Sequence, residues 1–193
     1  MGGNGSASFK KIRDKNNGGG GGSLSSIPKE AQDRLMGAQT AGEFFNKDNL
    51  TSLENNIVEY TGGGVFFTPS QTAQVNALIK ASPVKDAPLY RVEESTSQWE
   101  NIKAGDTFDR DIQSYSKSNE FVKENLKGNY DIDYDEPVLI KITGGQKSLN
   151  IQGYSSFKEQ EESLTSGKFK VSNVSHKDIG NYTKVKVIEL KQK

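Results

Sequence analysis

Apolar residues at helical spacing dominate the first half of the chain. Between positions 50 and 60 they recur every three or four residues, as expected of one helical face: Leu50, Leu53, Ile57 and Tyr60. Glycines at 62–64 end this helix, and Thr68 with Gln71 forms a capping box that starts another. The same reasoning predicts a short helix that stops at Gly105 and a further helix after Ser118.

The second half of the chain is strand-like. A run of apolar residues over 138–142 predicts a buried strand, and 89–92 predicts a shorter one. Further on, Phe169 and Val171 alternate with lysines, the period of a half-exposed strand, and residues 185–187 repeat the pattern. Helices first and strands later predict an α+β fold.

Composition divides the chain near residue 26. The first 26 residues hold eight of the 20 glycines but only three of the 43 Leu, Ile, Val and Phe side chains. Glycine loses more entropy on ordering than any other residue, and so few apolar side chains cannot form a core. We therefore predict a disordered, glycine-rich tail or linker over 1–26 and one folded domain over 27–193.

Composition also excludes several classes of site. The chain has no cysteine and one histidine, His176, so disulfides, thiolate zinc sites and histidine-rich metal sites are excluded. Its 25 basic and 25 acidic residues give no net charge, which argues against a polybasic nucleic-acid binder. No apolar run is long enough to span a membrane, so no membrane partner is expected.

A carboxylate cluster covers residues 159–162, between the polar stretch Tyr154–Ser156 and the strand near Phe169. On composition alone it is a solvated charged turn. Its surroundings, however, resemble the catalytic Glu-x-Glu or Gln-x-Glu turn of ADP-ribosyltransferases of the bacterial toxin and phage type.

Two further motifs of that family lie upstream in the expected order. A short strand ending in arginine is matched by Pro88–Val92, which contains Arg91. A Ser-Thr-Ser-like strand that leads into a helix is matched by Ile112–Ser116, with Tyr115 in place of the usual threonine. The resemblance covers about residues 50 to 190. It implies two packed, mainly antiparallel sheets around an NAD cleft, with helices mainly ahead of the arginine strand.

The resemblance implies a mono-ADP-ribosyltransferase that uses NAD as co-substrate, requires no metal and releases nicotinamide. The ribose passes through an oxocarbenium-like state, which a fixed carboxylate stabilises. Glu161 would supply this carboxylate, Ser114 would orient it, and Glu159 would approach the acceptor.

Ser114 would also help to bind NAD, together with Tyr115, Phe121 and Arg91, the last of which is counted among the catalytic residues as well. The fork of Arg91 suits the diphosphate, and Tyr115 or Phe121 could stack on the nicotinamide. The plainer alternative for Arg91 is a surface arginine paired with Glu93 or Glu94.

The register of the acidic turn has two solutions. Counting back from Gly167 gives Glu159-x-Glu161, the form associated with arginine acceptors. Counting from Leu164 gives Gln160-x-Glu162, the form associated with other acceptors such as asparagine. We favour Glu161, and with it an arginine acceptor.

The expected partner is a target protein, and a nucleic-acid acceptor is compatible with the same reaction. The alternative function is a non-catalytic virion- or toxin-associated binding module that keeps the fold. A nucleic-acid surface made of four alternating lysines is a weaker third option: Lys168, Lys170, Lys184 and Lys186. A phage or toxin protein of this kind would act in the cytoplasm of a target cell.

Overall fold

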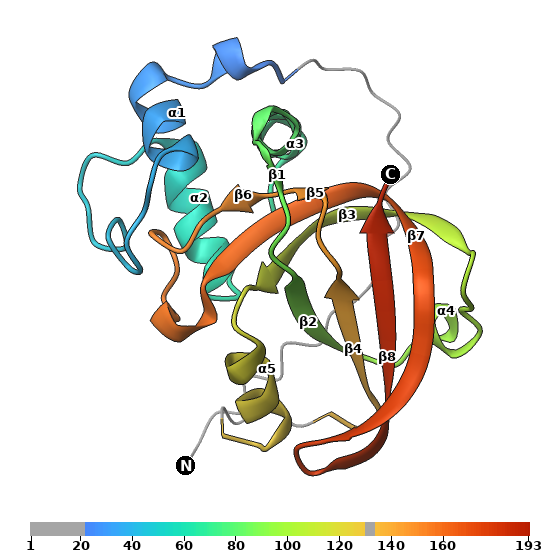
Figure 1. Ribbon diagram of the computed structural model, residues 1–193. Helices are drawn as coiled ribbons and strands as arrows, with labels where there is room; N and C mark the ends of the chain where they lie inside the picture. Colours follow the sequence, from blue (N-terminus) through green and yellow to red (C-terminus); the bar gives the residue numbers. More distant parts are fainter. Residues whose placement is uncertain (1–21, 130–133) are drawn as a thin grey trace.

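Three α-helices precede the strands in the computed structural model, which describes residues 22–129 and 134–193 (Figure 1). They are α1 (Lys29–Met36), α2 (Ser52–Thr61) and α3 (Pro69–Ala81), preceded by a 3-10 turn, η1 (Leu24–Ser26). The predicted capping box at Thr68 is confirmed, and Thr51 forms a second one with Glu54 at the start of α2.

The tail expected over 1–26 falls mostly on residues 1–21, which lie outside the described residues. Leu24 packs against the helical core, and Ile27 is buried. Packing in the described part therefore begins at Leu24, three residues before the boundary that composition indicates.

The strands of the described ranges are β1 (Val84–Lys85), β2 (Leu89–Glu94), β3 (Thr107–Ser116), β4 (Pro137–Ile142), β5 (Gln146–Lys147), β6 (Leu149–Asn150), β7 (Glu162–Ile179) and β8 (Tyr182–Gln192). Between them lie α4 (Ser97–Glu100), α5 (Asn119–Leu126) and the 3-10 turn η2 (Lys158–Gln160). The predicted helix after Ser118 is confirmed as α5, because the Ser118 side chain accepts from the backbone N–H of Phe121.

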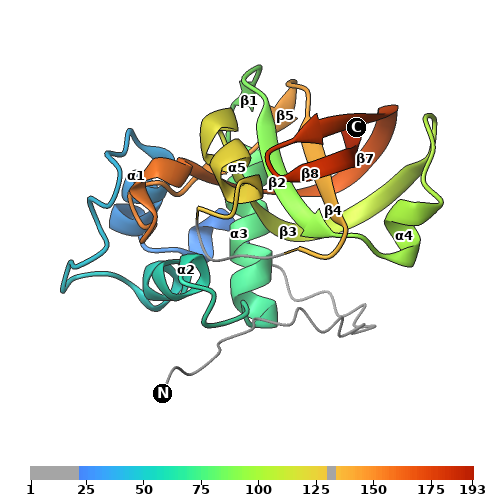
Figure 2. The same cartoon turned by 90° about the horizontal axis from the view of Figure 1, so that it is seen from below.

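The main sheet has the strand order β3-β2-β4-β8-β7-β6, and β1 and β5 form a second, two-stranded sheet. Only the β4–β8 pair is parallel among the pairings of the described residues. The long β7 pairs with β3 along its first half and with β8 along its second half, which joins the sheet edges into a ring (Figures 1 and 2). The α+β class with mainly antiparallel strands is confirmed.

The buried apolar side chains form a helical core, a ring core and a smaller cluster under α5. The helical core joins α1, α2 and α3 to residues of β6 and β7, including Leu149 and Leu164. The ring core fills the space enclosed by the strands and includes Trp99 and Tyr115. The third cluster packs α5 against β4 and β8.

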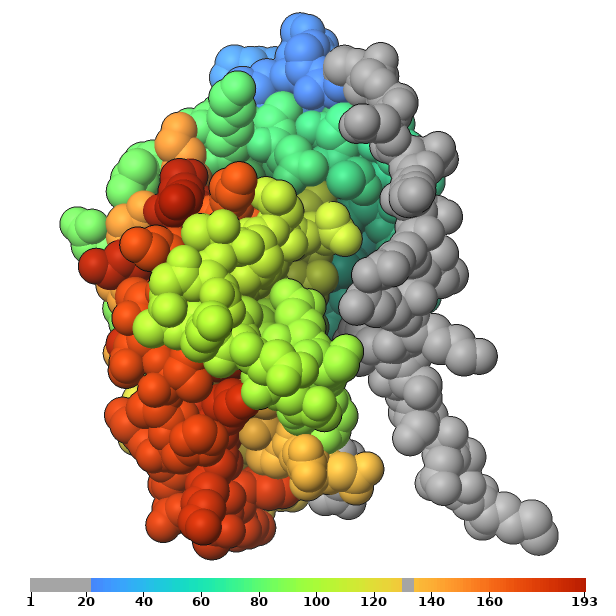
Figure 3. All heavy atoms as spheres, turned by 90° about the vertical axis from the view of Figure 1, so that its right-hand side faces the viewer, coloured from blue at the N-terminus to red at the C-terminus, as the bar shows by residue number. Residues whose placement is uncertain are grey.

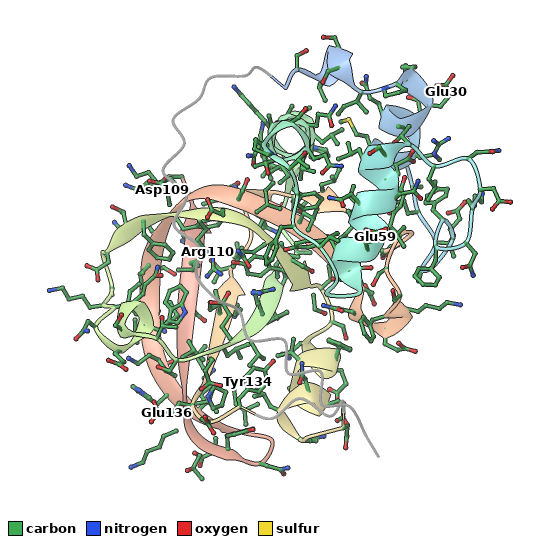
Figure 4. All side chains as sticks on the ribbon, turned by 180° about the vertical axis from the view of Figure 1, so that it is seen from behind. Glu30, Glu59, Asp109, Arg110, Tyr134 and Glu136 are labelled. Carbon is green, nitrogen blue, oxygen red and sulfur yellow. The ribbon has the colours of Figure 1, made fainter. Side chains whose placement is uncertain are left out.

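A bulge in β3 changes which side chains face the ring core. The β3–β7 register shifts between Arg110 and Gln113. Because strict alternation would place Arg110 and Tyr115 on opposite faces, the bulge is what allows both to point inward. Figure 4 shows Arg110 inside the ring and its neighbour Asp109 pointing away.

The guanidinium of Arg110 lies 5.2 Å from the ring centroid of Trp99 and 5.7 Å from that of Tyr115. Trp99 belongs to α4, which forms part of the face shown in yellow-green in Figure 3.

No helix in the described ranges combines the length and apolar character needed to cross a membrane.

Candidate functional site

A buried carboxylate lies at the first residue of β7. Glu162 is 2% exposed, and its Oε1 accepts a 2.6 Å hydrogen bond from the Ser114 hydroxyl on β3. Its Oε2 accepts a second bond from the Ser155 hydroxyl. The antiparallel β3–β7 pairing, in which Ser116 is the Cα partner of Glu162, brings the two strand ends together.

Burial raises the pKa of the Glu162 carboxyl above its usual value. The hydrogen bonds from Ser114 and Ser155 and the charge of Arg91 act in the opposite direction but do not cancel the effect of burial. These contacts favour the ionised form of Glu162, so the loss of any one of them would raise its pKa further.

Arg91 on β2 joins this cluster through the backbone. Its Nη1 donates a 2.8 Å bond to the Ser114 carbonyl oxygen, and its Nε donates a 2.7 Å bond to Glu93 Oε1. The side chain is 19% exposed. The pairing with Glu93 foreseen as the plainer alternative is therefore present, and it coexists with the contact to the Ser114 strand end.

Glu93 links Arg91 to the ring core. Its carboxylate also accepts from Arg110 Nη2 and from the Trp99 indole N–H at 3.1 Å. Burial alone would raise the pKa of Glu93, but the charges of Arg110 and Arg91 outweigh it and lower the pKa. Two arginines thus share one ionised carboxylate.

The other two glutamates of the turn lie outside the buried cluster. Glu159 is exposed on η2, and Glu161 is exposed with a left-handed backbone (φ 49°). The Glu161 carbonyl oxygen accepts a 3.3 Å bond from the Lys117 N–H at the end of β3. The structure therefore joins Ser114 to Glu162, whereas the sequence count favours Glu161 as its partner.

The two aromatic candidates do not meet at Glu162. Tyr115 is 1% exposed within the ring core, where burial raises the pKa of its hydroxyl to about 12. Phe121 packs against the smaller apolar cluster under α5 and not against the ring core. Stacking of either ring on nicotinamide stays a prediction.

Ser155 was not singled out from the sequence. It lies seven residues before Glu162 and is 1% exposed. The available signal was the pair of hydroxyl residues in Tyr154–Ser156, a polar stretch directly ahead of a carboxylate cluster.

Two shallow hollows of the described surface lie away from this cluster. One is lined by residues of η1 and α3, including Leu24 and Ala77, and the other by residues around α4, including Gln98 and Phe108. Neither is lined by Arg91, Ser114 or Glu162. Within the described ranges, no group of three or more His, Cys, Asp or Glu side chains could hold a metal ion.

Comparison with known proteins gives likeness in structure only. No protein-family model and no curated protein matches the sequence. Among solved structures, the chain is similar to Vis toxin, an ADP-ribosyltransferase from Vibrio splendidus (14% identity, 87% of this chain and 75% of that chain, TM-score 0.48).

Two further solved structures are similar at the same level. They are the C3 exoenzyme of Clostridium limosum (17% identity, 77% and 89% of the two chains, TM-score 0.48) and Plx2a, an ADP-ribosyltransferase toxin from Paenibacillus larvae (14% identity, 86% and 87%, TM-score 0.47). Roles for individual residues of this chain come from its own contacts.

Proposed function

We propose that the chain is an NAD-dependent mono-ADP-ribosyltransferase. It would move ADP-ribose from NAD to a side chain of a target macromolecule, a protein in the first place, and release nicotinamide. The observation that carries the proposal is the meeting of three motifs at one point: Arg91, Ser114 and Glu162 come from different strands and are joined by hydrogen bonds.

The contacts support a division of labour. Cleavage breaks the bond between ribose C1 and the nicotinamide nitrogen. The electron pair of this bond stays on the nitrogen, and nicotinamide leaves as a neutral molecule. Positive charge then develops on the ribose, and a fixed carboxylate stabilises that state more than the ground state. The acceptor nucleophile forms the new bond to C1 and loses one proton to the solvent. Glu162 has the fixed geometry this role needs.

Arg91 is suited to the diphosphate. Its Nε and Nη1 are committed to Glu93 and to the Ser114 carbonyl, whereas its Nη2 has no hydrogen bond to the described residues. A guanidinium held in place by two bonds presents its remaining N–H groups in a defined direction, which suits phosphate oxygens.

Glu162 as the carboxylate changes the expected acceptor. The residue two positions earlier is then Gln160, whose amide is neutral, and the turn follows the Gln-x-Glu form. We therefore propose an acceptor other than arginine, such as asparagine. The earlier arginine preference depended on Glu159-x-Glu161. A nucleic-acid acceptor remains compatible with the chemistry.

A non-catalytic binding module is the second candidate, and one observation favours it. Glu162 is 2% exposed, so little of its carboxylate is open to a ribose in this structure. A module that kept the fold without turnover would tolerate such a closed site.

Nicotinamide release separates the two candidates. The purified chain is incubated with NAD, and free nicotinamide is measured beside an Arg91→Ala variant. The transferase releases nicotinamide well above the variant, and labelled NAD in a cell lysate then identifies the acceptor by mass spectrometry. Release equal to that of Arg91→Ala contradicts the proposal. NAD-dependent thermal stabilisation without release indicates the binding module.

A further inference from the structure

The segment that leads from β6 to Glu162 is fastened to the helical layer. Gln39, just after α1, donates through Nε2 to the Asn150 carbonyl at 2.9 Å and accepts through Oε1 from the Gly153 N–H at 3.0 Å. Gln152 returns a 2.6 Å bond from its side-chain amide to the Gln39 carbonyl. Figures 1 and 2 show this orange segment beside the helices.

A buried charged network fastens the next residue, Tyr154. The Tyr154 hydroxyl donates a 2.8 Å bond to Glu54 on α2. Glu54 also accepts two bonds from Arg34 on α1, at 2.6 and 2.8 Å. Both Tyr154 and Glu54 are fully buried, and the Tyr154 ring packs against Phe44. Charge-assisted bonds of this kind in a buried site hold their partners in one geometry.

The residue after Tyr154 reaches the candidate site. The Ser155 oxygen accepts a 3.1 Å bond from the Phe157 N–H. A hydroxyl has one proton, and the closer of its two acceptors is the Glu162 carboxyl group; the Phe157 carbonyl lies 3.3 Å away. Ser114 serves one carboxylate oxygen and Ser155 the other.

We infer that Ser155 is a positioning residue that fixes the Glu162 carboxylate at the oxygen that Ser114 does not contact, and that the Arg34–Glu54–Tyr154 network holds Ser155 in place. The inference rests on the proposed function for its catalytic meaning. It gives the helical layer a role in the reaction, because α1 and α2 hold one of the two donors that orient the carboxylate.

The Ser155 bond has a consequence that a purely structural contact would lack. It stabilises the charged form of Glu162, so its removal raises the pKa of this carboxyl further and leaves one oxygen free to rotate. The rate of nicotinamide release then falls, and the acidic limb of its pH profile moves to higher pH.

The experiment compares Ser155→Ala with Ser163→Ala. Ser163 is the neighbour of Glu162, is fully buried, and its hydroxyl has no hydrogen-bond partner among the described residues, which makes it a matched deletion. Two readouts are used: the carboxyl carbon of Glu162 titrated by NMR in ¹³C-glutamate-labelled protein, and the pH profile of nicotinamide release.

In Ser155→Ala we expect the Glu162 titration to move to higher pH and the rate at neutral pH to fall about tenfold or more, the effect of one hydrogen bond to a charged group. Ser163→Ala leaves both unchanged, and Ser155→Thr, which keeps the hydroxyl, restores both. Tyr154→Phe, which removes the hydroxyl that donates to Glu54 and lies near Arg34, raises the Glu162 titration and lowers the rate by smaller amounts. It also provides the test if Ser155→Ala does not fold.

A Glu162 titration in Ser155→Ala and Tyr154→Phe equal to that of the unchanged chain overturns the inference. So does an equal shift in Ser163→Ala. Failure of the proposed function looks different: the NMR titration depends on Ser155 as expected, but the unchanged chain releases no nicotinamide.

Discussion

Ser114 and Glu162 lie 48 residues apart in the sequence and are joined by a 2.6 Å hydrogen bond from the serine hydroxyl to Glu162 Oε1. The carbonyl oxygen of the same serine accepts a hydrogen bond from Arg91. One residue at the end of β3 therefore connects the arginine strand to the carboxylate. Adjacent Glu161 points to solvent with a left-handed backbone, so the two neighbours are separable by mutation.

Glu162→Gln should lose nicotinamide release by about 10²–10³-fold, by analogy with the removal of one group that stabilises a transition state. The substitution keeps the size of the side chain; one serine hydroxyl can accept from the new NH2 group while the other still donates to the amide oxygen. Glu161→Gln, the matched control, should leave the rate nearly unchanged. The measurement is release of nicotinamide at saturating NAD.

The reverse result would restore the sequence-based register. If Glu161→Gln is the inactive variant and Glu162→Gln turns over normally, the catalytic carboxylate is Glu161. The preference for arginine acceptors then returns with it.

Glu162→Gln should also make the fold more stable at neutral pH. The pKa of Glu162 is higher in the folded state than in the unfolded state, where it is near 4.5. The fold therefore keeps its full free energy of unfolding while Glu162 is protonated, below about pH 4.5, and loses part of it as the pH rises through the folded-state pKa. Each pKa unit corresponds to about 1.4 kcal/mol, or roughly 3–5 °C in a domain of this size. Thermal unfolding of both proteins across pH gives the answer.

The gap in melting temperature should open as the pH rises above about 4.5 and be absent at lower pH. A gap that stays constant across pH would show that the carboxyl is not penalised by burial. Loss of activity together with a gain in stability would mark Glu162 as a residue kept for function.

Local signals explain why much of the fold could be predicted. The capping box at Thr68 and the cap at Ser118 fix helix starts through contacts within three residues, so the sequence contains them completely. The order of the motifs predicts only that Arg91 and Ser114 belong to one site. Their contact with the turn depends on the β3–β7 pairing.

The choice between Glu161 and Glu162 could not be made from the pattern. Residues 162–165 are all buried, and this part of β7 pairs with β3 along one edge and with β6 along the other. Such a strand shows no alternation of inside and outside that would reveal which glutamate points inward. The left-handed backbone at Glu161, unusual for a residue with a side chain, removes the remaining regularity. Counting back from Gly167 to Glu161 relies on the usual family spacing and takes no account of this backbone conformation.

Arg91→Lys should weaken NAD binding, because a lysine offers a point charge in place of the fork. We expect the KM for NAD to rise about tenfold or more, the effect of one bond to a charged group. Arg110→Lys is the matched control, since it also alters a contact with Glu93 but has no assigned contact with NAD. Equal KM values in both variants would indicate that the effect passes through Glu93.

Glu54→Gln should lower the free energy of unfolding at neutral pH by about 3 kcal/mol. This is the lower end of the cost of removing one partner of a buried ion pair. Arg34 would keep its charge, and its side chain is 27% exposed, so water offsets part of the loss. Burial raises the pKa of Glu54, but the bonds from Arg34, Thr51 and Tyr154 outweigh it and lower the pKa to about 2. A carboxyl with a lowered folded pKa contributes stability that is present above about pH 4.5 and is lost as the pH falls toward about 2. The difference in free energy of unfolding between the two proteins, measured by denaturant unfolding, should therefore be largest at neutral pH and shrink over that window.

The control is Glu43→Gln. Glu43 is an exposed carboxylate that accepts a bond from the Thr40 N–H, and its substitution should change stability little at any pH. A deficit in Glu54→Gln that persists undiminished at pH 2 would mean that shape, and not the ionised carboxylate, is what holds α1, α2 and Tyr154 together.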